Sequence, residues 1–133
     1  MIGVLMIGLL GCAPQPAPAP APAAPVKAAY RSVDLAAFKA DFYDGKVPLL
    51  VDVRNPDEYA AGHVPGARNI PLDQVESRVA ELDSFKNGPV YLICESGGRS
   101  ARASQLLAGR GYQAVNVQGG TYAWRNAGLP TER

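Results

Sequence analysis

The chain has 133 residues, enough for one globular domain, and its formal net charge at pH 7 is +1. Hydrophobic residues make up 47% and charged residues 19%, an ordinary globular composition, and no cluster of Lys and Arg indicates nucleic-acid binding. The two cysteines are too few for a disulfide framework, and no Cys/His pattern has the spacing of a zinc site, so neither a metal nor another cofactor is expected.

The first residues form an apolar run of signal-peptide length. Residues 2–10 are apolar or glycine, which is too short to span a bilayer, since a span needs roughly 20 residues. The run closes with LLGC, which resembles the bacterial lipobox, although no Lys or Arg precedes it. The resemblance implies a signal peptide over residues 1–11 and a lipidated Cys12 that anchors the protein to a membrane. The alternative is a frayed apolar tail with an incidental cysteine.

The next segment alternates alanine and proline. Proline lacks an amide hydrogen, so residues 13–29 should favour extended polyproline II structure, and with the lipidated Cys12 they make up the segment 12–29. We expect them to form a spacer between a membrane and a domain at residues 30–133, although a disordered tail without function has the same composition. By resemblance to Gram-negative lipoproteins, Ala13 after the lipobox cysteine implies the outer membrane, facing the periplasm.

From Tyr30 onward, the apolar spacing predicts alternating helices and strands. Ser32 is expected to cap a first helix that ends at Gly45, and a helical turn is expected near residues 57–61. Further helices are predicted at 72–82, 100–109 and 121–127, a loop at 62–71, and buried strands at 48–53, 89–94 and 114–117. The strands are apolar on both faces, so we predict the α/β class, with a mainly parallel central sheet covered by helices on both faces.

Ligands of such sheets bind at the carboxyl ends of strands, and Cys94 is the last residue of a predicted strand. Cys94 is the first residue of the loop CESGGRS. Gly97 and Gly98 of this loop permit positive φ, so successive backbone N–H groups can point toward the centre of the loop. The free N–H groups at the start of the helix expected from Ser100 also point to the centre of the loop, and Arg99 adds a positive charge. These features favour a thiolate at Cys94 rather than a buried structural cysteine.

Two nucleophilic chemistries use a cysteine in an anion-binding loop: sulfur transfer through a persulfide, and hydrolysis of phosphate esters. Four residues separate Cys94 from Arg99, whereas a cysteine phosphatase of this architecture has five. The shorter loop disfavours a phosphatase or an arsenate reductase-like enzyme. Glu95 would oppose an anion if it pointed inward, so we expect it to point outward and to influence substrate choice.

Three motifs resemble those of the single-domain rhodanese (thiosulfate sulfurtransferase-like) family. They are VDVRNPDEYAAGHVPGARNIP at 51–71, CESGGRSARA at 94–103 and VQGGTYAWRNAGLP at 117–130. The resemblance implies a three-layer rhodanese-like fold with Cys94 as the catalytic cysteine. It also implies, together with the loop chemistry, a catalytic role for Arg99 and a substrate-binding cradle made by Glu95, Ser96, Gly97, Gly98 and Ser100.

The function expected from this resemblance is sulfurtransfer from a donor such as thiosulfate to a thiol or cyanide acceptor, by double displacement at Cys94. The alternative is a carrier or binding module that hands the persulfide to a protein partner with little small-molecule turnover. The acidic Glu95 makes efficient use of small dianions such as thiosulfate doubtful. Outside the loop, His63 is expected to be structural, and Asp52 and Arg54 to form a local ion pair or a loop anchor. Trp124, with Tyr122, is expected to cover the sheet.

Overall fold

The computed structural model describes residue 11 and residues 29–133. Residues 1–10 and 12–28, which include Cys12 and most of the predicted signal peptide and spacer, lie outside the described residues, so those predictions remain untested. None of the helices in the described part of the chain combines the length and the apolar character that a membrane crossing requires.

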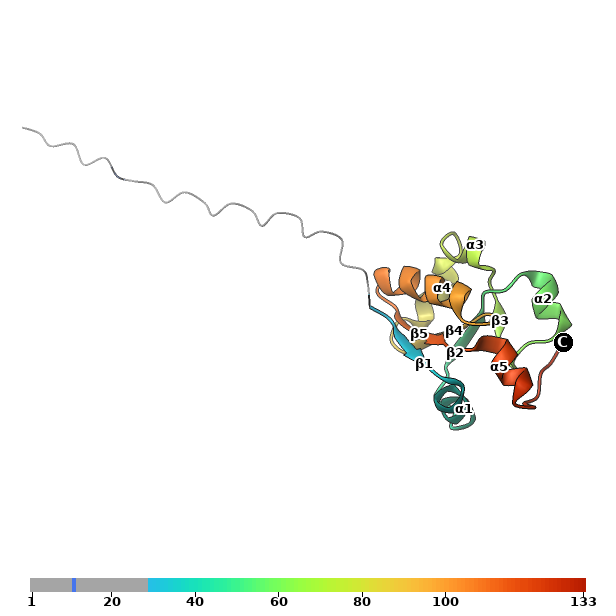
Figure 1. Cartoon of the computed structure of the whole chain (residues 1–133). Coiled ribbons are helices and arrows are strands. Elements are labelled where there is room, and N and C mark those ends of the chain that lie inside the picture. The colour runs from blue at the N-terminus through green and yellow to red at the C-terminus, as the bar shows by residue number, and fades with distance from the viewer. Residues whose placement is uncertain (1–10, 12–28) are drawn as a thin grey trace, which may run out of the picture.

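A five-stranded parallel sheet forms the centre of the domain, in the order β1-β5-β4-β2-β3 (Figure 1). The strands are β1 (Arg31–Val33), β2 (Leu49–Asp52), β3 (Arg68–Asn69), β4 (Pro89–Ile93) and β5 (Gln113–Val117). The predicted α/β class and parallel sheet are therefore confirmed, with β1 and β3 as additional short strands at the two edges.

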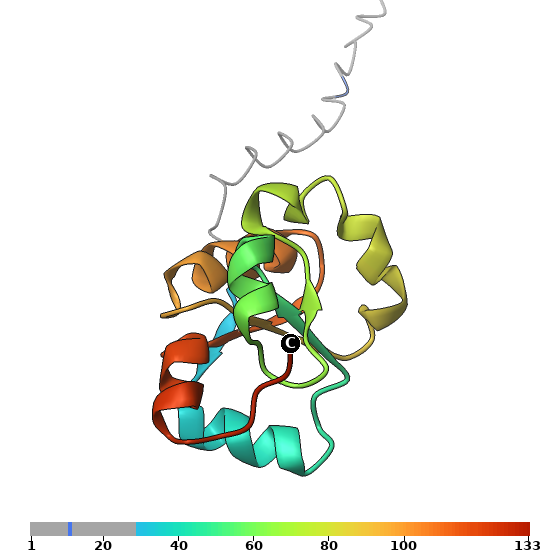
Figure 2. The same cartoon turned by 90° about the vertical axis from the view of Figure 1, so that its right-hand side faces the viewer.

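Helices cover both faces of this sheet. One face carries α3 (Leu72–Val75), the 3₁₀ helix η1 (Val79–Phe85) and α4 (Gly98–Gly109), and the other carries α1 (Leu35–Tyr43) and α5 (Gly120–Asn126). Figures 1 and 2 show α1 and α5 together on one side of the strands and α4 on the opposite side. The short α2 (Pro56–Ala61) follows β2 at the carboxyl end of the sheet.

The alternation of side chains along β4 explains why both faces are apolar. Val90 and Leu92 pack in the cluster beneath α4, while Tyr91 and Ile93 pack in the cluster beneath α1 and α5. Cys94 continues the first series and joins the α4-side cluster. Strand periodicity thus turns the cysteine side chain toward the helix that follows it.

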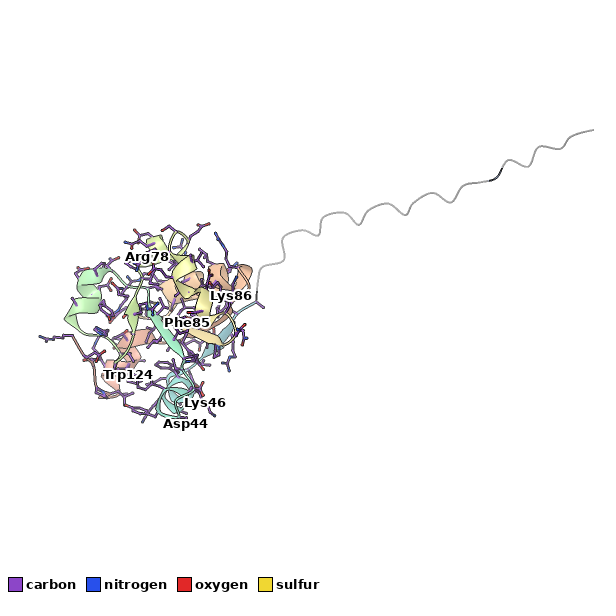
Figure 3. All side chains as sticks on the ribbon, turned by 180° about the vertical axis from the view of Figure 1, so that it is seen from behind. Asp44, Lys46, Arg78, Phe85, Lys86 and Trp124 are labelled. Carbon is purple, nitrogen blue, oxygen red and sulfur yellow. The ribbon has the colours of Figure 1, made fainter. Side chains whose placement is uncertain are left out.

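The opposite face holds Trp124, whose side chain is fully buried, as predicted for a residue that covers the sheet. The same prediction was wrong for Tyr122, which is 58% exposed. The ring of Trp124 packs against Phe38 and Phe42 of α1, with centroid separations of 5.6 and 5.2 Å. Its Nε1–H donates to the carbonyl of Pro130 at 2.8 Å. Figure 3 labels this tryptophan among the side chains near α1. These contacts fix α5 against the sheet.

Three local predictions were wrong. Ser32 is not a helix cap but lies in β1, because parallel pairing with β5 holds residues 31–33 extended. Asp34 caps α1 instead, accepting the amide hydrogen of Ala37 at 2.9 Å. The predicted helix at 72–82 divides into α3 and η1, and the predicted loop at 62–71 contains β3, which pairs with β2.

Candidate active site

The proposed nucleophile lies at the carboxyl end of the central strand β4. Cys94 follows that strand directly and is 1% exposed. The chain then turns through Gly97, whose φ of +113° favours glycine, and enters α4 at Gly98. Of the two glycines that permit positive φ, Gly97 adopts it, whereas Gly98 is the first residue of the helix. The helix begins two residues earlier than predicted, so Ser100 lies in its first turn.

Hydrogen-bond donors surround the sulfur atom. The amide of Gly97 donates to Cys94 Sγ at 3.0 Å, and the hydroxyl oxygen of Ser100 lies 3.3 Å from it. Burial raises the pKa of the Cys94 thiol, but hydrogen bonds from the Ser100 hydroxyl and from the amides of Ser100, Gly97 and Ser96 outweigh burial and lower the pKa below its ordinary value. The loop therefore provides a site for a thiolate.

Arg99 forms an ion pair across the mouth of the loop. Its Nη1 and Nη2 donate to the two carboxylate oxygens of Glu58 on α2, at 2.8 and 2.9 Å. This bidentate pair lowers the pKa of Glu58, chiefly through the hydrogen bonds from Arg99. Sequence reasoning missed Glu58, which lies 41 residues away along the chain. The positive charge of Arg99 is thus compensated rather than available in full to the sulfur.

Glu95 lies at the rim of the site, with its side chain 33% exposed. Its carboxylate accepts from Arg54 Nη1 at 3.3 Å and is also paired with the guanidinium of Arg125 on α5. Arg54 is itself buried and is bound to Asp52 at 2.8 Å, which confirms the predicted local ion pair. The outward position expected for Glu95 is therefore correct in part, because the carboxylate reaches the rim but is held there by two arginines.

The start of α5 clamps the loop through backbone contacts. The amide and the hydroxyl of Thr121 both donate to the carbonyl of Cys94, at 2.8 and 3.1 Å, and the amide of Tyr122 donates to the carbonyl of Glu95 at 3.0 Å. Gly120 makes this approach feasible, because a Cβ atom at that position would lie 2.3 Å from the Cys94 carbonyl oxygen. The Gly-Gly pair of the motif at residues 117–130 therefore helps α5 to hold the loop after β4 in place.

Asn116 of β5 is a further neighbour of the loop that sequence reasoning missed. Its Oδ1 lies 2.6 Å from the hydroxyl oxygen of Ser100, and its side chain is buried. The signal in the sequence was a single polar residue inside the otherwise apolar strand segment AVNV. Asparagine is uncommon in strands, so a buried one indicates a specific hydrogen-bonding role.

Two pockets flank the Glu58–Arg99 pair. One of about 420 Å³ contains Glu58 and is lined by both partners of the rim ion pair, Glu95 and Arg125. The other, of about 600 Å³, contains Arg99 and is lined mainly by α3 and α4. Within residues 11 and 29–133, no group of three or more His, Cys, Asp or Glu side chains is placed to hold a metal ion.

His63 lies outside this constellation. Its imidazole stacks on Tyr59 with a centroid separation of 3.7 Å, and its Nδ1 is 2.9 Å from the carbonyl oxygen of the same residue. Its backbone pairs with Glu132 near the end of the chain. These contacts agree with the structural role predicted for His63.

Comparison with known proteins agrees with this geometry. The family described as "Rhodanese-like domain" matches residues 34–127. A protein of Allochromatium vinosum named sulfurtransferase is 35% identical over 99 residues, which cover 74% of this chain and 91% of that protein. YqhL of Bacillus subtilis is 46% identical over 76 residues, covering 56% of this chain but only 59% of YqhL.

Among solved structures, a rhodanese-related protein from Thermoplasma volcanium superimposes with a TM-score of 0.70 at 29% sequence identity. The match covers 77% of this chain and 98% of that structure. The residues that match the family, 34–127, include β2 to β5 and the loop after β4.

Proposed function

Because the chain belongs to the family of rhodanese-like domains, we propose that it is a sulfurtransferase in which Cys94 carries the transferred sulfur as a persulfide. In the first half-reaction, the thiolate attacks the outer sulfur of a sulfane donor. The sulfur–sulfur bond of the donor breaks, and the leaving group departs with the bonding electron pair. In the second half-reaction, a thiol or cyanide acceptor attacks the outer sulfur of the persulfide and regenerates the thiolate.

The observation that carries this proposal is the ring of donors around one sulfur at a strand end. Gly97 and Ser100 contact Sγ directly, and the pKa of the Cys94 thiol is lowered although the side chain is buried. Donors arranged in this way stabilise negative charge on the attacking thiolate, and they can stabilise a persulfide anion in the same loop. No separate proton-transfer residue is needed to generate the nucleophile.

The charges at the rim bear on the class of donor. Arg99 is paired with Glu58, and Arg125 with Glu95, so these two guanidinium groups each have a carboxylate partner. A site selective for a small dianion such as thiosulfate would present uncompensated positive charge. We therefore expect Glu95→Lys, which removes a carboxylate and releases Arg125, to lower the Michaelis constant for thiosulfate at low ionic strength. An unchanged or raised constant would show that Glu95 does not influence this donor.

The same compensated rim favours a second candidate function, that of a carrier which passes the persulfide to a protein acceptor. Loading would then occur once per molecule, with negligible turnover on small donors and cyanide. Comparing the amount of persulfide formed with the rate of thiocyanate production separates the two functions. Multiple turnovers at a rate comparable with loading would support the enzyme, and stoichiometric loading alone would support the carrier.

The direct test is the intact mass of the purified protein after incubation with thiosulfate or a low-molecular-weight persulfide. We expect a gain of one sulfur atom that cyanide removes and that is absent from Cys94→Ser. Far-ultraviolet circular dichroism and a melting curve establish that the variant is folded. A folded Cys94→Ser protein that still gains and transfers sulfur would exclude Cys94 as the carrier.

A further inference from the structure

A buried asparagine lies behind the serine that contacts the sulfur. Asn116 is 4% exposed and stands in register with Leu92 of β4. Two residues earlier on the same strand, Ala114 packs into the apolar cluster beneath α4. A buried amide on such a face costs free energy unless its polar atoms are hydrogen bonded. In residues 29–133, the side chain of Asn116 makes its hydrogen bond with one partner, Ser100.

Ser100 cannot satisfy all its neighbours with one hydroxyl proton. Its oxygen lies 2.6 Å from Asn116 Oδ1, 3.2 Å from the carbonyl oxygen of Gly97 and 3.3 Å from Cys94 Sγ. A hydroxyl has one donor and two acceptor lone pairs, so a proton given to the asparagine is withheld from the sulfur. The shortest contact is with Asn116. The atom that Asn116 presents therefore controls where the Ser100 proton points.

The side-chain amide of Asn116 can present either of two atoms of similar shape. With Oδ1 toward Ser100, the amide accepts the hydroxyl proton, and the Ser100 oxygen can accept the S–H of a neutral Cys94 thiol. With Nδ2 toward Ser100, the amide donates to the hydroxyl oxygen, and the hydroxyl proton turns to the sulfur. The first arrangement suits the thiol, and the second suits a thiolate or a persulfide anion.

We propose that Asn116 is a positioning residue whose amide directs the Ser100 proton to the sulfur of Cys94 when that sulfur is negatively charged. The inference rests on the proposed function, in which the thiolate and the persulfide are the reacting forms. Ser100 and Cys94 are 0% and 1% exposed, so bulk water does not compete for these hydrogen bonds. Asn116 acts through the serine and does not contact the substrate.

The test is the pH dependence of Cys94 alkylation by iodoacetamide, which follows the thiolate and requires no sulfur donor. Asn116→Leu keeps the number of side-chain heavy atoms and the branch at Cγ and removes the hydrogen bonds. We expect the midpoint to rise by roughly one pH unit, a tenfold loss of thiolate below the midpoint. Ser100→Ala should raise it similarly. Because the two residues act in series, the double variant should show no larger rise than Ser100→Ala alone.

The matched control is Asn69→Ala, which removes an amide that donates to the carbonyls of Asp52 and Arg54 at 3.0 Å but has no hydrogen bond to Ser100. This control should leave the midpoint unchanged. Asn116→Ala is the second test variant, because a smaller side chain avoids crowding if leucine does not fit. Circular dichroism and melting curves identify the folded variants.

A wild-type midpoint in either folded Asn116 variant would overturn the proposal, as would shifts that add to that of Ser100→Ala. An equal shift in the Asn69 control would indicate general loosening and would also overturn it. If both Asn116 variants fail to fold while Ser100→Ala folds, Asn116 serves the fold rather than the sulfur. A shifted midpoint in a protein that transfers no sulfur would support the role of Asn116 and contradict only the proposed function.

Discussion

Replacing Gly120 by alanine should damage both the stability of the domain and the reactivity of Cys94. A Cβ atom at this position would lie 2.3 Å from the carbonyl oxygen of Cys94 and 2.6 Å from that of Glu95, whereas ordinary contacts begin at 3.4 Å. The neighbours are backbone atoms of the active loop, so they cannot move aside as a flexible side chain could. The loop must therefore retreat from α5 by about 1 Å.

The expected cost has two parts. Gly120 has a φ of +57°, and a left-handed conformation costs a residue with a Cβ about 1–2 kcal/mol. Separation of the loop from α5 also breaks the three hydrogen bonds from Thr121 and Tyr122 to the carbonyls of Cys94 and Glu95. At about 1 kcal/mol each, these add about 3 kcal/mol. The unfolding free energy should therefore fall by about 4–5 kcal/mol.

Gly45→Ala is the matched control for the backbone conformation. Gly45 has a φ of +72°, and a Cβ atom there would meet no heavy atom within 4 Å. Urea denaturation should show a loss of about 1–2 kcal/mol in this variant, with unchanged Cys94 alkylation. Gly120→Ala should lose more stability and should alkylate more slowly in its folded state. Equal losses of unfolding free energy in the two variants would show that the close approach of α5 to the loop adds nothing to the stability of the domain.

Three further predictions concern other parts of the chain. Because hydrogen bonds lower the pKa of Cys94 despite burial, Cys94 should be alkylated at lower pH in the folded protein than in the urea-unfolded chain. The reverse order would contradict the lowered pKa of the thiol. Arg99 lowers the pKa of Glu58 in the folded protein. The Glu58 carboxylate should therefore stabilise the fold above its unfolded pKa of about 4.3, and this contribution should disappear as the pH falls through the folded pKa. The unfolding free energies of wild type and Glu58→Gln should therefore converge in acid, and a difference constant across pH would exclude this linkage. Cys12→Ser should abolish palmitate labelling and membrane fractionation, whereas unlabelled wild-type protein in the cytoplasm would refute the lipoprotein proposal.

Local patterns in the sequence were sufficient to predict the class of the fold and the position of Cys94 at the end of a strand. The apolar runs that became β2, β4 and β5 are bounded by turn residues and alternate with helical spacing, which favours a parallel sheet. Cys94 follows one run directly and precedes two glycines. Strand ends and glycine turns depend mainly on neighbouring residues, so these features could be inferred without tertiary information.

The partners of the side chains around the sulfur were decided by the tertiary structure. Arg99 follows the cysteine closely in sequence, but its charge is compensated by Glu58 from another helix. Asn116 comes from the adjacent strand, and its position beside Ser100 depends on the register of β5 with β4. Ser32 became a strand residue for the same reason, because pairing with β5 outweighed its local tendency to cap a helix. Sequence spacing specifies local conformation, whereas these contacts depend on how distant segments pack, which no local pattern encodes.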